Sequence, residues 1–130
     1  MIRSFRDLDV WKRAMALTKD VYRLANALPA SERYGLVSQL QRAAVSVPAN
    51  IAEGHARDST REFIRFVSIS LGSLAELVTL VELSAELHEL RDTDPSLLLA
   101  EMEELRLMLR GLQGSLKARL APPSSLLPSP

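Results

Sequence analysis

Six polar residues with helical spacing are the first part of this chain that could carry chemistry. Between residues 35 and 65, polar side chains recur at steps of three and four. On an α-helix this spacing aligns them along one side of the rod, where amide, hydroxyl, carboxylate and guanidinium groups can act together. The stripe could face another helix, another subunit or a ligand. We call it the polar stripe, and its members are Gln39, Arg42, Ser46, Asn50, Glu53 and Arg57.

Pro48 lies within the same segment and breaks the rules for a helix interior. Proline has no amide hydrogen and clashes with the carbonyl four residues earlier, so we expect Ala44 to lose its normal donor and the helix to kink. The cost is about 3 kcal/mol, which packing elsewhere must offset. Asn50 is a poor helix former two residues further on. We expect its amide to bond a freed carbonyl or to reach a neighbouring helix, with contact to a ligand as the alternative.

The chain offers few groups for catalysis or metal binding. It has no cysteine, no Glu-x-x-His pair of the kind that binds di-iron centres, and no Gly-x-Ser-x-Gly or phosphate-binding motif. His55 and His88 each follow a glutamate by two residues, which points the paired side chains apart, so we expect both at the surface or at helix ends. Glu53, Glu62 and Glu76 are explained more simply by ion pairing, capping, or hydrogen bonds between helices or subunits than as acid and base. We predict no catalytic residue, cofactor or metal ion, and no enzyme activity.

Charge is balanced overall but uneven along the chain. The 16 basic and 16 acidic residues give a net charge of zero, which argues against coating nucleic acid through bulk charge alone. Residues 1–75 contain 11 Lys or Arg against 7 Asp or Glu, whereas residues 76–130 contain 5 against 9. The first helix is therefore the expected electropositive face. Its candidate nucleic-acid contacts are Lys12, Arg13, Lys19 and Arg23.

Two apolar helices are predicted before residue 55. The first begins at a cap on Ser4 or Asp7 and extends to about Leu28. Its main seam follows steps of three and four and consists of Val10, Ala14, Leu17, Val21, Leu24 and Leu28. A second seam beside it widens the apolar face and consists of Leu8, Trp11, Met15 and Tyr22. The second helix covers residues 36–54, with an apolar stripe of Leu36, Leu40, Ala43, Val47 and Ile51.

The third helix begins at a capping box formed by Ser59 and Glu62 and is expected to reach about Leu90 as the longest of the set. Gly72 and Ser73 should allow a close approach of the backbone to a neighbour. The residues expected to point inward are Phe63, Phe66, Ser70, Leu74, Leu77, Val81, Ser84 and Leu87.

The fourth helix is signalled by Asp94 as the cap and Pro95 as its first residue. Its leucine-rich seam continues the same spacing through Leu98, Met102, Leu105, Leu109, Leu112 and Leu116. No segment alternates polar and apolar residues with a period of two, so we predict an all-α, antiparallel up-down four-helix bundle over residues 1–120. Residues 121–130 form a Pro/Ser-rich tail that is expected to be disordered or extended. The absence of a signal peptide or an apolar run of about 18 residues makes a cytoplasmic location the expectation.

Three segments carry a family resemblance, and they are FRDLDVWKRAMAL, ERYGLVSQLQRAAVSVPANIAEGHARDSTREFIRF and SLGSLAEL. They closely resemble bacterial four-helix bundle proteins first noticed as products of intervening sequences in large ribosomal RNA genes. The most specific part is SVPANIAEG, from Ser46 to Gly54, and the likeness is good from Phe5 to about Leu90. The resemblance implies a cytosolic bundle that assembles into a ring, usually a homopentamer. More distant relatives of this architecture are basic accessory proteins that bind nucleic acid and a reverse transcriptase.

These observations predict a non-enzymatic, homo-oligomeric scaffold or adaptor that assembles through the wide faces of its first two helices and presents repeated polar surfaces to a protein partner. The alternative is an RNA- or DNA-binding accessory factor, for example the partner of a reverse transcriptase. No membrane partner is expected. The sequence alone does not choose between these functions.

Overall fold

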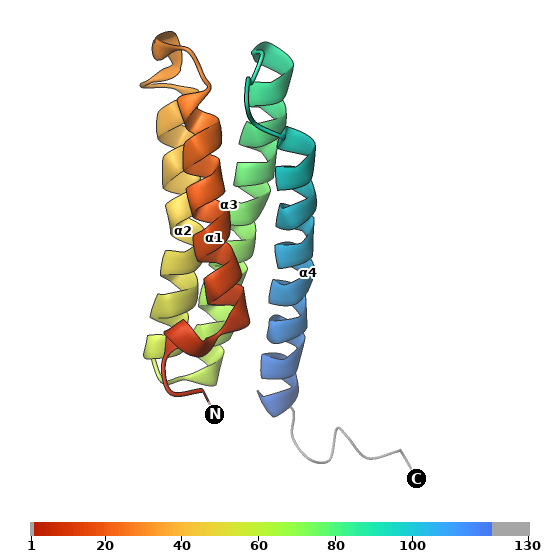
Figure 1. Cartoon of the computed structure of the whole chain (residues 1–130). Helices are drawn as coiled ribbons and strands as arrows, with labels where there is room; N and C mark the ends of the chain where they lie inside the picture. The colour runs from red at the N-terminus through yellow and green to blue at the C-terminus, as the bar shows by residue number, and fades with distance from the viewer. Residues whose placement is uncertain (1, 121–130) are drawn as a thin grey trace.

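The chain folds into four helices that pack around one core. The computed structural model describes residues 2–120, and within them it contains α1 (Asp9–Asn26), α2 (Leu36–Ala56), α3 (Thr60–Leu87) and α4 (Pro95–Leu120) and no strand. Successive helices run in opposite directions, so the N-terminal segment, the α2–α3 connection and the end of α4 lie together at the lower end in Figure 1. The predicted all-α fold is confirmed. The predicted tail at 121–130 lies outside the described residues.

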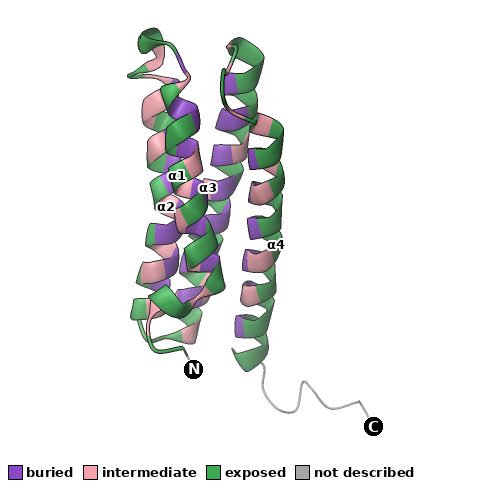
Figure 2. Cartoon of the chain, in the orientation of Figure 1, coloured by how far each residue is buried: buried purple, intermediate pink, exposed green. Residues whose placement is uncertain are grey.

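The core follows the predicted seams closely. Every member of the main α1 seam and of the apolar α2 stripe is buried, and the buried positions of all four helices face one another along the molecule (Figure 2). The second α1 seam is less covered. Leu8, Trp11 and Met15 are half-buried, and Tyr22 is 41% exposed. The outer flank of α1 therefore keeps an apolar surface that no other part of residues 2–120 covers.

The first helix is shorter than predicted at both ends. Ser4 caps a separate 3-10 helix, η1 (Phe5–Asp7), and the extended backbone of Leu8 interrupts the chain before α1 begins. At the other end α1 stops before Leu28, because proline at position 29 disfavours helical geometry in the residue that precedes it. Leu28 is nevertheless buried, so its place in the core was predicted correctly although its helical conformation was not.

Three expectations for α3 need correction. The helix is the longest, as expected, but it ends at Leu87 rather than near residue 90, and Leu87 is 59% exposed instead of pointing inward. The reason is that the next residue, His88, is extended and turns back toward the α1–α2 connection. Gly72 does not serve a close approach, because a Cβ atom placed there would meet nothing within 4 Å.

α3 is also the one described helix that is long and apolar enough to span a membrane, with a mean hydropathy of 1.7 over its best window. The sequence expectation that no such segment exists is therefore too strong. However, 44% of that window is buried among the other helices, and the core helix of a soluble protein has the same properties. The finding is weak evidence for a membrane span.

α4 begins as predicted, with the Asp94 carboxylate accepting a hydrogen bond of 3.0 Å from a backbone amide of the first turn. The buried seam of α4 differs from the predicted one at one position. Leu112 is only half-buried, and the neighbouring Gln113 is buried instead. The Gln113 side chain is satisfied there, because its amide donates to the Ser68 hydroxyl at 2.7 Å and its carbonyl accepts from Arg110 at 2.9 Å.

Candidate functional site

The polar stripe lies along the side of α2 that faces α3. Its two central members, Ser46 and Asn50, are half-buried, and the four outer members are exposed. The Ser46 hydroxyl lies 2.7 Å from the Ser73 hydroxyl on α3. The Asn50 amide donates to the Ser46 carbonyl at 2.8 Å and to its hydroxyl at 2.9 Å. The centre of the stripe is thus a hydrogen-bonded contact between helices within one chain.

Asn50 therefore reaches α3 only through Ser46. Of the outcomes predicted for its amide, a bond to a backbone carbonyl is observed, but that carbonyl belongs to Ser46 and not to Ala44, the residue that Pro48 deprives of a donor. The donor to Ala44 comes from α1, whose Thr18 hydroxyl lies 3.1 Å from that carbonyl. The same hydroxyl lies 2.8 Å from the carbonyl of Ala14, so the two acceptors share one proton. The sequence signal for this contact was a threonine inside an apolar helix.

Gly54 explains the end of the most specific sequence segment. α2 and α3 approach so closely here that a Cβ atom on Gly54 would lie 2.6 Å from Cβ of Phe66 and 3.1 Å from Cδ1 of Phe63. Only glycine leaves the two phenylalanines their places in the core. The close approach expected on α3 is thus found on α2. Together with Pro48 and Asn50, Gly54 shows that the segment from Ser46 to Gly54 serves the packing of α2 against its neighbours.

The lower end of the stripe is an ionic cluster. Glu53 pairs with Arg57 at 2.9 Å, as predicted, and Arg57 also lies 3.8 Å from Glu62 on α3. Glu62 bonds Arg65 at 2.9 Å, and this bond lowers the pKa of the Glu62 carboxyl below its usual value. The guanidinium groups of Arg57 and Arg65 lie 5.1 and 4.7 Å from the ring centre of Phe66. These charges stabilise one another and the ring beside them.

The upper end of the stripe is more open. Gln39 and Arg42 are exposed. Because Ser46 on α2 faces Ser73 on the antiparallel α3, Arg42 lies at about the level of Glu76. Glu76 is exposed, and the described residues show no hydrogen bond or ion pair to it. The hydrogen-bond acceptor role predicted for Glu76 between helices is therefore not seen, and a role between subunits stays a prediction.

The four candidate cations of α1 are all exposed but differ in their partners. Arg13 forms an ion pair with Glu104 on α4, and Arg23 bonds Asp20 at 2.7 Å. Lys12 and Lys19 form no ion pair with any described residue. The predicted electropositive face of α1 is thus partly neutralised, by Asp20 one turn away on the same helix and by Glu104 from α4.

Both histidines lie at helix ends, as predicted. His55 packs edge-on against Phe63, with ring centres 5.7 Å apart. His88 follows α3 and its Nε2 lies 2.7 Å from the Glu32 carboxylate in the α1–α2 connection. This hydrogen bond lowers the pKa of Glu32. Sequence spacing gave no signal for the pair, because 56 residues separate its members. The described residues contain no group of three or more side chains suited to hold a metal ion.

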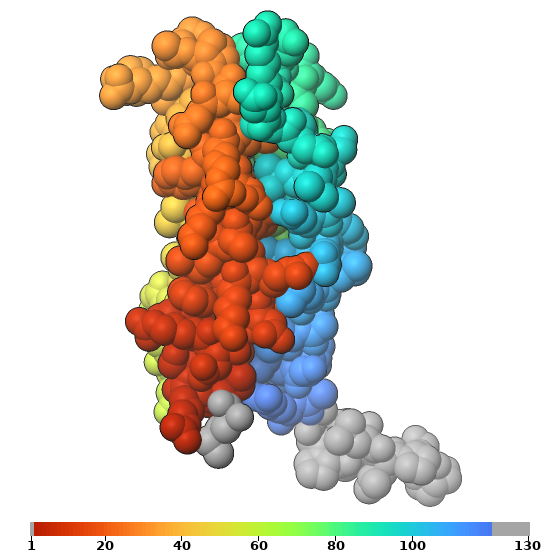
Figure 3. All heavy atoms as spheres, viewed as in Figure 1, coloured from red at the N-terminus to blue at the C-terminus, as the bar shows by residue number. Residues whose placement is uncertain are grey.

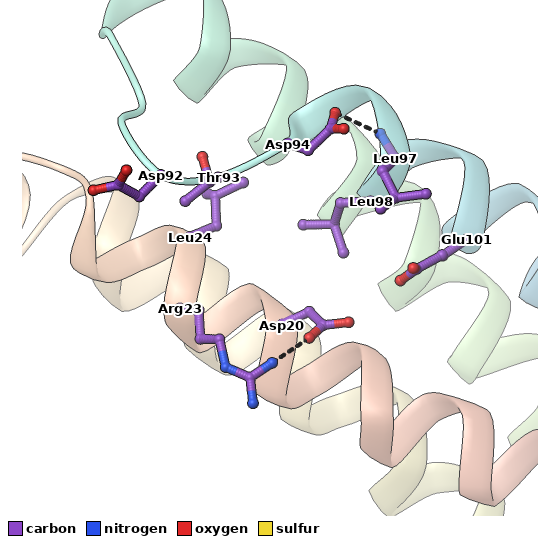
Figure 4. Close-up of a pocket in the computed structure, with 9 residues that line it drawn as sticks. All are labelled: Asp20, Arg23, Leu24, Asp92, Thr93, Asp94, Leu97, Leu98 and Glu101. Atoms are coloured by element: carbon purple, nitrogen blue, oxygen red, sulfur yellow. Dashed lines mark hydrogen bonds and ion pairs between the residues drawn. The ribbon is translucent and has the colours of Figure 1, made fainter.

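A groove of about 350 Å³ lies where α1 meets the α3–α4 connection and the start of α4 (Figure 4). Leu24 and Leu98 form its apolar floor, and carboxylates from three segments surround it. Burial, and next the neighbouring carboxylate of Asp20, raise the pKa of Glu101. The two acids are brought together by the weakest helix contact of the bundle, α1 against α4. Sequence reasoning missed this site, because none of its residues share a motif.

The fold and these contacts define an all-α protein of four helices whose most specific segment serves the α2–α3 contact. Comparison with protein families places it more narrowly, since the family described as 23S rRNA-intervening sequence protein matches residues 6–111. The protein belongs to this family, as the resemblance predicted. The match extends beyond the segments that carried the resemblance and includes most of α4. No curated protein sequence matches the chain.

Proposed function

We propose that this protein is a non-enzymatic, homo-oligomeric scaffold whose subunits associate through the outer surface of α1 and α2. The observation that carries the proposal is an apolar groove between these helices. It has a volume of about 410 Å³, and Tyr22 and Val45 border it with 41% and 45% of their surfaces exposed. Thr18, Lys19 and Arg23 form the rest of its lining. An aromatic centre with a polar and charged rim is the usual composition of a protein interface.

The same outer flank of α1 continues this surface beyond the groove. Trp11 and Met15 are half-buried and line an adjoining depression together with Lys12 and Lys19. A contiguous apolar surface of this kind is a liability for a monomer and is explained by association with a second copy. Family resemblance supports a closed ring, in particular a homopentamer in the cytoplasm. Cyclic symmetry would use this face and a different face of the next subunit.

A scaffold role also agrees with the state of the polar stripe. Its hydroxyl, amide and lower-end charged groups are bonded to one another or to α3, which leaves them committed to packing rather than free to activate a substrate. Its exposed upper end, around Arg42, is available to a neighbouring subunit or to a protein partner. Repetition around a ring would present that surface several times and raise the avidity for a partner with repeated sites.

Static light scattering coupled to size exclusion tests the assembly at micromolar concentration. Wild-type protein is expected to elute as an oligomer, and Val45→Glu should shift it toward the 14.4 kDa monomer by placing a charge in the groove. Leu107→Glu is the matched control, because Leu107 is 58% exposed on α4, away from the α1–α2 groove. A monomeric wild type, or loss of the oligomer in the control but not in Val45→Glu, contradicts the proposal.

A second candidate is an RNA- or DNA-binding accessory factor, for example a partner of a reverse transcriptase. The observation in its favour is the uneven charge of the sequence, which is basic over residues 1–75 and acidic over residues 76–130. The charged residues of α1 support it less than the sequence suggested, since Arg13 and Arg23 are held by acids. Wild-type binding of RNA or DNA that weakens steeply with salt is the expected result for this candidate, and no binding at low salt contradicts it.

A further inference from the structure

The two ends of the bundle carry opposite charge. The lower end in Figure 1 comprises residues 2–12, 53–65 and 110–120, and it contains nine Lys or Arg against five Asp or Glu. The opposite end comprises residues 14–42 and 76–103, with five basic residues against ten acidic ones. We call these the basic end and the acidic end. The asymmetry between the two halves of the sequence thus becomes an asymmetry along the long axis of the molecule.

Most acidic side chains of the basic end form ion pairs or hydrogen bonds with other groups of the same end. Glu53 and Glu62 pair with arginines of the same cluster. Asp7 accepts the backbone amides of Arg3 and Ser4, at 2.8 and 3.1 Å. These bonds hold the pKa of the Asp7 carboxyl below its usual value. The carboxylates that remain at this end are those of Asp9 and Asp58.

Six cations at the same end are exposed and form neither an ion pair nor a side-chain hydrogen bond with any described residue, whereas the exposed Arg110 donates to Gln113. They come from three separate segments, the N-terminal segment with the start of α1, the start of α3, and the last turns of α4. Their positions are Arg3, Arg6, Lys12, Arg61, Lys117 and Arg119. By contrast, Arg13 and Glu104 form an ion pair midway along the bundle, on the face where α1 and α4 lie side by side (Figure 3).

The acidic end hardly weakens the electrostatic field of the basic end, because the two ends are far apart. α4 alone has 26 residues and is therefore about 39 Å long, whereas the screening length in physiological salt is about 8 Å. A polyanion at the basic end would respond to the local excess of positive charge and hardly at all to the acids of the far end. A net charge of zero therefore does not argue against binding at one end.

We propose that the basic end binds the phosphate backbone of nucleic acid. The inference rests on the second candidate function and gives it a location other than the face of α1. Cyclic assembly would strengthen the site, because equivalent points of a cyclic oligomer lie on one circle and the basic ends would form a single ring of positive charge. The aromatic rings of this end already pack against other side chains, Phe5 against Trp11 and Phe66 beneath two arginines. The basic end would therefore contact phosphates rather than bases and would tolerate any base sequence.

The test compares two triple variants with the same change in net charge. Arg61→Gln, Lys117→Gln and Arg119→Gln together remove three unpaired cations of the basic end. The matched control combines Arg33→Gln, Arg91→Gln and Arg106→Gln, three exposed cations that lie outside both the basic end and the α1–α2 groove. Fluorescence anisotropy with a labelled 30-nucleotide RNA of mixed sequence measures the dissociation constant from 50 to 200 mM salt. Light scattering on each variant reports the oligomer separately.

The expected result is micromolar binding by the wild type and the control at 50 mM salt, with at least tenfold weaker binding by the basic-end variant. The slope of log K against log salt should fall in magnitude by about 2 for three lost phosphate contacts on a single strand. Equal losses in both variants, loss in the control alone, or no wild-type binding overturns the inference. Binding to vesicles of anionic lipid but not to RNA overturns it as well. In all these cases an intact oligomer leaves the scaffold proposal standing.

Discussion

Two glycine-to-alanine substitutions should have opposite effects on stability, although both glycines lie inside helices. At Gly72 an added Cβ atom meets nothing within 4 Å, so Gly72→Ala should gain the helix propensity of alanine, about 0.8 kcal/mol. At Gly54 the same atom would lie 2.6 Å from Cβ of Phe66, where ordinary contacts begin near 3.4 Å. Because this Cβ is fixed to the α3 backbone, the helices themselves must separate.

Overpacking of this kind costs about 1–3 kcal/mol, and the upper part of the range applies because no flexible side chain can move aside. After the gain in helix propensity, Gly54→Ala should lower the free energy of unfolding by about 1–2 kcal/mol. The two variants should therefore differ by about 2–3 kcal/mol, or roughly 10 °C in melting temperature for a domain of this size.

Urea unfolding followed by circular dichroism at one fixed protein concentration measures both variants, since the stability of an oligomer depends on concentration. Equal slopes against urea would show that the unfolded states are comparable. The reasoning is refuted if Gly54→Ala is as stable as Gly72→Ala, because the close approach of α2 to α3 would then impose no constraint.

The remaining predictions concern two other contacts. Thr18→Val should lower the free energy of unfolding by about 1 kcal/mol in the wild type but hardly at all in a Pro48→Ala background. In that background a restored backbone amide donates to the Ala44 carbonyl, which the Thr18 hydroxyl otherwise serves. Equal losses in the two backgrounds, measured by urea unfolding, would count against this role of Thr18. Glu101→Gln should raise the melting temperature at pH 7, because it removes a half-buried charge beside Asp20. A raised pKa means that the folded state holds its proton more tightly, so wild-type stability from this group increases as pH falls and the advantage of Glu101→Gln should shrink toward pH 4. Glu82→Gln, at an exposed position of α3, is the control, and a Glu101→Gln variant less stable than wild type at pH 7 would contradict the argument.

Helix identity and the main core were predictable from sequence because both depend on local periodicity. The steps of three and four that define the α1 seam specify which residues face inward without reference to any partner. Helix ends were less predictable. Leu87 satisfies the apolar spacing of α3 yet is exposed, because the helix ends there and the chain continues with the extended His88, which bonds Glu32. The residue that His88 contacts lies 56 positions away in the sequence, so the periodicity of α3 does not signal this end.

The candidate site was predictable in composition but only partly in its contacts. The polar stripe was visible as a pattern, and its pairing of Glu53 with Arg57 follows from spacing within one helix. The partner of the carbonyl freed by Pro48 was not predictable, since Thr18 reaches it from another helix. The neutralisation of Arg13 by Glu104 depends likewise on how α1 lies against α4. Contacts between helices require the register of one helix on the next, which no single helix encodes.

The bond between Glu32 and His88 has a consequence for the dynamics of the molecule. It joins the α1–α2 and α3–α4 connections at the end where no covalent link holds the two helical hairpins together. The opposite end is held by the α2–α3 connection itself. Opening of the hairpins should therefore begin at the acidic end, and amide hydrogen exchange should quicken there first when His88 is replaced by alanine. The bond between Glu32 and His88 thus holds the two hairpins together at one end of the bundle, and the α2–α3 connection holds them together at the other.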